Sequence, residues 1–244
     1  MNRATGNDSH PIRIEYCRRG SYHRRDLKPP MSMPIMKTTL LTLLLATTLS
    51  GCAVGNKHAY HDIEATTSAK TEKSVSVATL DQREYVISGQ SKPELVGMQR
   101  GGFGNPFDVL TASGRPLSSE FTSTVKRALE RNGIKVVTVE TKPSSPTQPA
   151  MADLMASAGD RLLLLNIKEW IGDSQINTEL RYNLQLLVAD KTGKTLATKN
   201  YSGSRNLGGS QLNPPGHAKE VMPAAFREAV EHLLNSREIM AALQ

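Results

Sequence analysis

Hydrophobic and polar positions alternate most clearly in the second half of the chain. Residues 178–190 (TELRYNLQLLVAD) alternate with period two, which is typical of a strand with one buried face, and the predicted inward set is Leu180, Tyr182, Leu184, Leu186 and Val188. The preceding residues 161–170 (RLLLLNIKEW) begin apolar at consecutive positions, as a central strand does. A turn at 190–193 leads into another strand at 194–203. Strands joined this closely must be antiparallel, so the pattern predicts a β-meander.

The region before this meander predicts shorter strands. Residues 74–83 (SVSVATLDQR) alternate valine with serine, which indicates a half-buried strand. Further short strands are predicted at 85–89, 94–98, 107–110 and 134–139. The glycines of 101–106 (GGFGNP) form half of a dinucleotide-binding fingerprint, but Phe107 stands where the third glycine is needed. A hairpin turn is therefore the preferred interpretation of this stretch.

Helical periodicity appears in four places. Ser118 is the predicted N-cap of a helix that runs to Asn132 and ends at Gly133, with an apolar stripe made of Phe121, Val125, Ala128 and Leu129. A short helix is expected at 151–159, after a proline-rich exposed loop at 141–150. After a loose stretch, 206–217, a final long helix is expected with one apolar side, Met222, Phe226, Ala229, Val230 and Leu233. A short last helix holds Ile239 and Leu243.

Together these elements predict one α+β domain over residues 74–244. We expect an antiparallel-rich mixed sheet, with the meander in its C-terminal half and two main helices packed on one face. A domain of this size buries enough surface to be stable alone. Residues 53–73, which follow Cys52, have hardly any periodic apolar positions, so 52–73 is interpreted as a flexible tether spanning roughly 25 Å.

A leucine-rich run precedes Cys52 and has the features of a secretory leader. Residues 36–51 contain Lys37 and then an apolar segment of about a dozen residues, whereas a membrane-spanning helix needs about 20. The alternative is a buried leucine-rich helix, for which the threonines and terminal small residues are poorly suited. Residues 1–35 are interpreted as an over-extended gene start or a disordered arm; their paired arginines only faintly match a twin-arginine signal.

The sequence Leu49-Ser50-Gly51-Cys52 resembles the bacterial lipobox at every position. The resemblance implies cleavage between Gly51 and Cys52, a diacylglyceryl group on the Cys52 thiol and acylation of the new amine. Three acyl chains would make membrane anchoring effectively permanent. Ala53, in the second position of the mature chain, resembles the signature for sorting to the outer membrane, with the domain on its periplasmic face.

Charge and cysteine content narrow the function classes. The net charge of +7 comes mostly from the segment up to Lys37, which has eight basic and three acidic residues, against 22 and 20 from Cys52 onward. Nucleic-acid binding is therefore not expected, because it needs clustered cations on the mature surface. Cys17 and Cys52 are the two cysteines, so the region after Cys52 has no disulfide or thiolate metal site.

No catalytic, cofactor-binding or metal-binding constellation is found in the sequence, and an enzyme is not expected. His58 and His61 form a His-x-x-His pair without a third ligand nearby. Asp81 and Arg83 are interpreted as a structural ion pair, although either could meet a partner. Further polar candidates are weaker still and are expected to be solvated or capping: Ser204, Ser210, His217 and His232. Trp170 is assigned either to an interface or to edge packing.

The order of VATLDQR, the glycine turn, LSSEFTSTVKRALERNGIKVV and the long meander is similar to the YajG-type family of uncharacterised bacterial lipoproteins. More distantly, the chain is similar to auxiliary lipoproteins of ABC-type lipid transporters. The YajG-type resemblance implies no functional residue beyond the lipidated Cys52. The lipobox, the tether and the lack of convergent polar residues lead us to expect a lipid-anchored binding or scaffolding module that works with a cell-envelope protein and needs no cofactor. The alternative is an accessory lipoprotein of a lipid or small-molecule transport system, with lipid cargo in an apolar pocket between sheet and helices.

Overall fold

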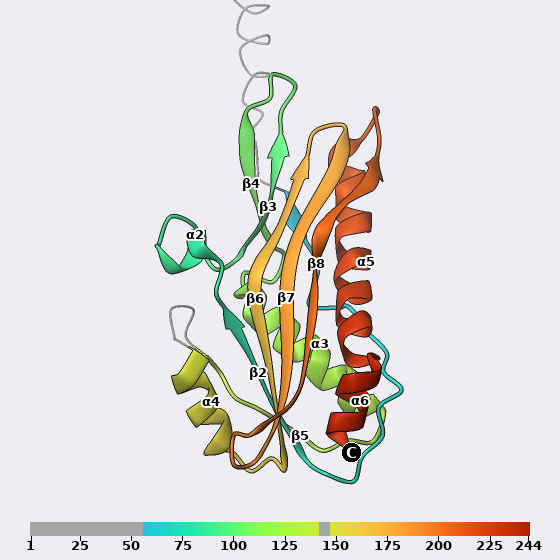
Figure 1. Cartoon of the computed structure of the whole chain (residues 1–244). Helices are drawn as coiled ribbons and strands as arrows, with labels where there is room; N and C mark the ends of the chain where they lie inside the picture. The colour runs from blue at the N-terminus through green and yellow to red at the C-terminus, as the bar shows by residue number, and fades with distance from the viewer. Residues whose placement is uncertain (1–55, 142–146) are drawn as a thin grey trace, which may run out of the picture. The chain divides into compact units, whose positions relative to one another are not determined.

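A computed structural model describes residues 56–141 and 147–244, in which helices cover both faces of a mixed eight-stranded sheet (Figure 1). The predicted arm, the leader, the cleavage site and Cys52 lie outside the described residues, as does half of the predicted proline-rich loop, residues 142–146. The α+β class is confirmed, and the longest strand pairings are antiparallel, as predicted.

The strands are β1 (Lys57–His58), β2 (Val75–Asp81), β3 (Leu95–Arg100), β4 (Pro106–Thr111), β5 (Val136–Thr138), β6 (Arg161–Ser174), β7 (Asn177–Asp190) and β8 (Thr195–Gly209). The helices are α2 (Glu84–Ile87), α3 (Leu117–Arg131), α4 (Thr147–Met155), α5 (Pro214–Leu234) and α6 (Arg237–Leu243). The predicted meander is confirmed as β6–β7–β8, and the five predicted inward residues of β7 are all buried.

The sheet is forked along the long strand β6 (Figure 1). One edge of β6 pairs with β7 along nearly its whole length. On the other edge, Arg161–Ile167 pairs in parallel with β2, and β5 follows β2. Further along the same edge, Gly172–Ser174 pairs in parallel with β3, which continues to β4 and β1. At the apex of the fork, the carbonyls of Pro93 and Leu95 on the β3 branch accept hydrogen bonds from a side chain, that of Arg83.

The buried Asp81–Arg83 ion pair occupies this fork. Arg83 Nε and Nη2 donate to the two Asp81 carboxylate oxygens at 2.8 and 2.7 Å, and both side chains are fully buried. The guanidinium also donates to the carbonyls of Pro93, at 3.0 Å, and Leu95. Burial opposes the charged guanidinium, but the hydrogen bonds and charge of Asp81 outweigh it and raise the pKa of Arg83. The predicted structural ion pair is confirmed, and it links the two branches.

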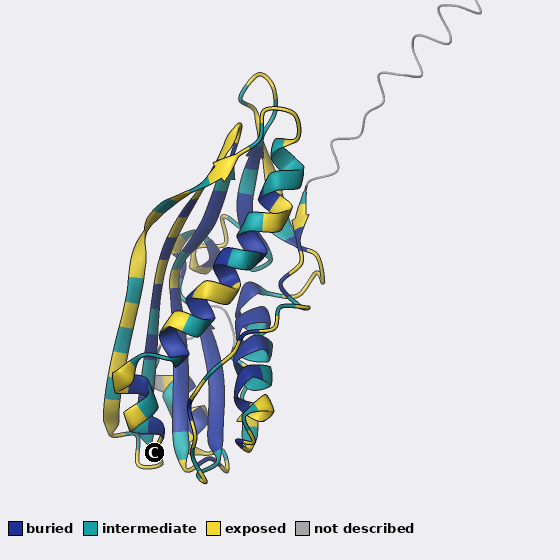
Figure 2. Ribbon diagram, turned by 90° about the vertical axis from the view of Figure 1, so that its right-hand side faces the viewer, coloured by how far each residue is buried: buried dark blue, intermediate teal, exposed yellow. Residues whose placement is uncertain are grey.

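Helices α3 and α5 pack together on one face of the sheet, as predicted, and carry rows of buried residues (Figure 2). An aromatic core lies between these helices and the sheet. The ring of Phe226 lies 4.2 Å from Phe121, 4.5 Å from Tyr60 and 5.8 Å from Trp170, measured between centroids. Trp170 is fully buried and its indole N–H donates to the Tyr60 hydroxyl at 3.2 Å. The tryptophan is therefore a core residue, neither at an edge nor at an exposed interface.

The prediction that β2 is half buried is wrong. Helix α4 covers the second face of the sheet, where Leu154 packs with Leu80 and Leu162 in a separate apolar cluster. The strand is consequently buried at every position. Ser76, whose polarity suggested a solvent-exposed face of the strand, accepts a 2.6 Å hydrogen bond from the Ser157 hydroxyl just beyond α4.

The prediction of a flexible tether does not hold for residues 56–73. β1 pairs with β4, and Tyr60, Ala65 and Ala69 are buried against the helices. The backbone N–H groups of Thr66 and Ser68 donate to side chains at the C-terminal end of α5 and just after it, at 2.9 and 2.8 Å. The apolar residues are too widely spaced to produce a periodic pattern, and side chains from α5 replace the missing backbone partners.

Several element boundaries also differ from prediction. Residues 85–89 form the helical turn α2, in which the Arg83 carbonyl accepts from the N–H groups of Val86 and Ile87. Ser118 is not an N-cap, because α3 already begins at Leu117 after Pro116. α4 begins four residues before the predicted 151. The stretch 206–217 is largely ordered, since β8 runs to Gly209 and α5 begins at Pro214.

Candidate functional site

The histidines and serines singled out in the sequence do not converge on one site. His58 is buried in β1, and its Nδ1 has no hydrogen-bond partner, whereas His61 Nε2 lies 3.1 Å from Asp62. Burial, with a smaller contribution from the charge of Lys219, lowers the pKa of His58 to about 4. Within residues 56–141 and 147–244, no group of three or more metal-ligating side chains is found.

The other polar candidates have local structural contacts. His217 Nε2 lies 3.2 Å from the Leu207 carbonyl, and the His232 ring stacks on Tyr201 at 4.3 Å. Ser204 lies within β8, and Ser210 accepts a hydrogen bond from the Asn213 N–H at 3.1 Å. These contacts are those of turn and helix-end residues.

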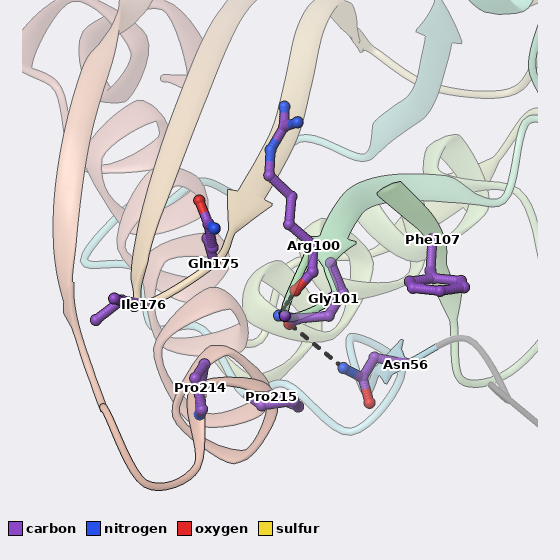
Figure 3. Close-up of a pocket in the computed structure, with 10 residues that line it drawn as sticks. Asn56, Arg100, Gly101, Phe107, Gln175, Ile176, Pro214 and Pro215 are labelled. Carbon is purple, nitrogen blue, oxygen red and sulfur yellow. Dashed lines mark hydrogen bonds between the residues drawn. The ribbon is translucent and has the colours of Figure 1, made fainter. Parts of the chain in front are cut away.

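A cleft of about 610 Å³ lies at the end of the domain where the described chain begins (Figure 3). It is formed by Asn56, the β3–β4 hairpin, the β6–β7 turn and the first residues of α5. These segments are far apart in the sequence and meet because β6 brings β3 and β7 to its C-terminal end. We take this end of the domain, which we call the Asn56 end, as the candidate functional site.

Hydrogen bonds beside the cleft link Asn56, β3 and β6. Gln99 Nε2 donates to the Ser174 carbonyl at 3.0 Å, which links β3 to β6. Asn56 Nδ2 donates to Gln99 Oε1 at 3.4 Å, the contact drawn in Figure 3, and so ties the start of the described chain to the same residue. Arg100 donates to both Asp173 oxygens, at 2.8 and 2.6 Å, and this partner raises the pKa of Arg100.

Glycine permits the close backbone approach behind the cleft. A Cβ on Gly97 would lie 2.6 Å from the Gly172 carbonyl oxygen, where β3 meets β6. At the hairpin tip, Gly104 has a φ of +82°, and the Gly101 N–H donates to the Asn105 carbonyl at 2.9 Å. The hairpin turn predicted from 101–106 is thus confirmed.

The turns of the Asn56 end are uncharged and carry exposed apolar side chains. No charged residue occurs in 101–106, 175–177 or 208–216. Phe103 and Leu212 are each 99% exposed, and Ile176 is 53% exposed. This surface offers apolar contact and backbone polarity, and its turn residues include no acid or base; their one hydroxyl, Ser210, accepts from the Asn213 N–H.

The turns at the opposite end of β6 are charged. The β7–β8 turn contains Asp190, Lys191 and Lys194, and β6 itself begins with Arg161 after Asp160. Hydrogen bonds from Thr192 lower the pKa of Asp190, as those from Ser74 do for Asp160. The turns at the two ends of the domain therefore differ in charge.

A second cleft, of about 720 Å³, lies between α3 and β5 and is lined mainly by hydroxyl-bearing and charged residues. Two of its cations already have partners: Arg115 lies 3.2 Å from Glu120, and Lys126 lies 3.8 Å from Glu130. This cleft lacks the exposed apolar tips of the Asn56 end.

Sequence reasoning missed the Asn56 end as a site. Each tip had a visible local signal, a single bulky apolar residue in an uncharged turn rich in glycine, asparagine or proline. The grouping of the tips depends on strand order, however, which the local pattern does not give.

No protein-family model matches the chain, and no curated protein matches it. Among solved structures, protein XCC0632 from Xanthomonas campestris, of the family DUF330, superposes with a TM-score of 0.51 at 13% identity, covering 77% of this chain and 97% of that one. At this identity the likeness shows a shared fold alone. Lipoprotein GNA1162 from Neisseria meningitidis gives a TM-score of 0.27 at 14% identity, covering 64% and 96%, which is too low to bear on function. The YajG-type resemblance stays a prediction.

Among the described residues, none of the helices has both the length and the apolar character required to cross a bilayer.

Proposed function

We propose that this chain is a bacterial lipoprotein, anchored through Cys52 to the periplasmic face of the outer membrane, whose folded domain is a binding or scaffolding module for an envelope complex. The observation that carries the proposal is the sequence Leu49-Ser50-Gly51-Cys52 directly behind a leader-like apolar run. The anchor supplies the membrane attachment, and the domain supplies the contact surface.

The arrangement of the domain supports a binding role. Its most buried charged groups are committed to structure: Asp81 and Arg83 bind each other, and Glu120 accepts from Arg115 at 3.2 Å. The bulky apolar side chains that stay fully exposed, Phe103 and Leu212, gather at one end. Exposed apolar residues grouped in this way are typical of contact surfaces.

Lipid carriage as an accessory transport protein is the second candidate, and the Asn56-end cleft favours it. The space between the sheet and the helices is not the cargo site, because Tyr60, Phe121, Trp170 and Phe226 fill it with fully buried rings. Any cargo would instead enter the cleft of about 610 Å³ beside Phe107 and Ile176.

Processing of the two cysteine variants tests the anchor. In cells, Cys17→Ala protein should mature normally, appear in the outer-membrane fraction and show a diacylglyceryl thioether by intact-mass measurement. Cys52→Ala protein should keep its leader or lose its membrane location, since its thiol cannot be acylated. Normal maturation and fractionation of Cys52→Ala protein would refute the proposal.

The role of the domain is tested by crosslinking and mass spectrometry of the anchored protein. An envelope protein crosslinked through a cysteine introduced at an exposed position away from the Asn56 end, Ile87→Cys or Val137→Cys, supports a binding module. A phospholipid that copurifies with the protein and is lost on filling the cleft by Gly102→Trp supports carriage. Failure to capture either, together with hydrolytic activity of the pure protein, would contradict both roles.

A further inference from the structure

We propose that the Asn56 end of the domain lies directly on the bilayer that holds the Cys52 lipid, with Phe103, Ile176 and Leu212 inserted at the headgroup level. This inference rests on the proposed lipid anchor. It specifies which surface of the domain faces the membrane and makes the lipid bilayer the occupant of that surface.

Chain length limits how far the domain can stand from its anchor. Asn56 is four residues after Cys52, and four residues span at most about 14 Å when fully extended. The headgroup layer of one leaflet is itself about 5–7 Å thick. Because residues 56–73 are packed on the domain, they cannot serve as the spacer that the sequence suggested.

Asn56 lies among the segments that form the uncharged end. Its carbonyl accepts from the Leu110 N–H of β4 at 3.2 Å, and its side chain reaches Gln99 of β3. Gly101 and Gly102 of the hairpin share the cleft with Asn56, as do Ile176 and Pro214 (Figure 3). A lipid within reach of Asn56 therefore brings the turns that carry Phe103, Ile176 and Leu212 toward the same bilayer.

The chemistry of these turns matches a membrane interface. Transfer of a charged group into the acyl region is costly, and none occurs in 101–106, 175–177 or 208–216. Each turn instead offers one bulky apolar side chain, and aromatic or leucine residues enter the boundary between headgroups and acyl chains. The charged turns, including 190–194, lie at the far end of β6 and β7, in the direction away from the bilayer.

Position-specific fluorescence tests this orientation in the full, matured protein. The chain has no cysteine after Cys52, whose sulfur is a thioether in the anchored form, so an introduced cysteine is the one thiol available for labelling. Phe103→Cys and Leu212→Cys report on the Asn56 end, and Leu196→Cys, at 41% exposure near the start of β8, is the matched control. All three replace exposed side chains, and circular dichroism verifies folding.

Each bimane-labelled variant is reconstituted in vesicles of phosphatidylethanolamine and phosphatidylglycerol that contain a lipid with a headgroup-proximal nitroxide. We expect the nitroxide to quench the labels at 103 and 212 at least about threefold more strongly than the label at 196, because an inserted tip lies within the boundary region. Aqueous iodide should quench in the opposite order.

The outcomes separate this inference from the proposed anchor. Intact mass shows whether Cys52 is acylated; an unmodified Cys52 overturns the anchor and this inference with it. Acylated protein whose labels at 103 and 212 are as open to iodide as the label at 196 overturns the membrane-facing orientation alone. Labels shielded from both quenchers also overturn it, and they would assign the Asn56 end to a protein contact, with an envelope partner or with a second copy of the chain.

Discussion

Replacement of Arg83 by methionine is expected to cause the largest loss of stability among these predictions. Methionine keeps an unbranched apolar stem but removes the guanidinium that donates to Asp81 and to the carbonyls of Pro93 and Leu95. The variant leaves a fully buried carboxylate without a cation and removes the side-chain donor of the Leu95 carbonyl, whereas the Pro93 carbonyl keeps the Leu117 N–H at 3.0 Å. Breaking a buried pair on one side typically costs about 3–5 kcal/mol.

That loss is a large part of the total. Domains are commonly stable by about 5–15 kcal/mol, so Arg83→Met should remove at least about a fifth of the free energy of unfolding. With a urea dependence of about 2–3 kcal/mol per molar, the unfolding midpoint should fall by roughly 1–2 M. The fluorescence of Trp170, the single tryptophan, follows the transition because the residue is buried near the fork.

Arg100→Met is the matched control. Arg100 also forms a bidentate ion pair with an aspartate, Asp173, but its side chain is 36% exposed. Water can therefore solvate the Asp173 carboxylate once the guanidinium is removed. Its loss should be less than half that of Arg83→Met. Equal midpoints for the two variants would refute the view that the buried pair holds the fork together.

Two further predictions concern the core and the β3–β6 junction. Because burial lowers the pKa of His58 to about 4, the unfolded chain binds more protons than the folded one below about pH 6.5. The free energy of unfolding should therefore fall on acidification toward pH 4, by up to about 1.4 kcal/mol per pH unit. Urea titrations of His58→Leu at several pH values should show a weaker dependence of that free energy on pH. Gly97→Ala places a Cβ against the Gly172 carbonyl, and this overpacking should lower the free energy of unfolding by about 1–3 kcal/mol and the thermal midpoint with it. Gly102→Ala, whose Cβ meets nothing within 4 Å, should leave the thermal midpoint unchanged.

The meander could be predicted because one face of β7 is wet and the other buried, which gives period two directly. The burial of β2 could not be predicted, because its polar residues look solvent-facing in the sequence. In the structure the hydroxyls of Ser76 and Thr79 are buried and form hydrogen bonds with those of Ser157 and Thr122. Residues 56–73 were missed for a related reason: their few apolar anchors follow no helical or strand period.

The candidate site was still less accessible to prediction. Phe103, Ile176 and Leu212 belong to three turns that are far apart in the sequence, and their common location follows from parallel pairing of β3 with the end of β6. The pairing of parallel strands is determined by tertiary packing rather than by a local turn, so no single stretch of sequence predicts that these three turns lie at the same end of the domain.

The fork also determines how the Asn56 end is attached to the rest of the domain. The branch that contains β1, β4 and β3 pairs with β6 only along Gly97–Gln99. There Gly97 lies directly against Gly172, which leaves no room for side chains between the two strands. Hydrogen bonds support this junction, from Gln99 to the Ser174 carbonyl and from Arg83 to the Leu95 carbonyl. The orientation of the Asn56 end relative to the aromatic core therefore depends on these directional hydrogen bonds as well as on the buried apolar contacts of Tyr60, Val96 and Val109. Because Arg83 supplies several of these bonds at the apex, its removal should loosen the hairpin that carries Phe103 before it disturbs the meander, which is paired along its whole length on the opposite edge of β6.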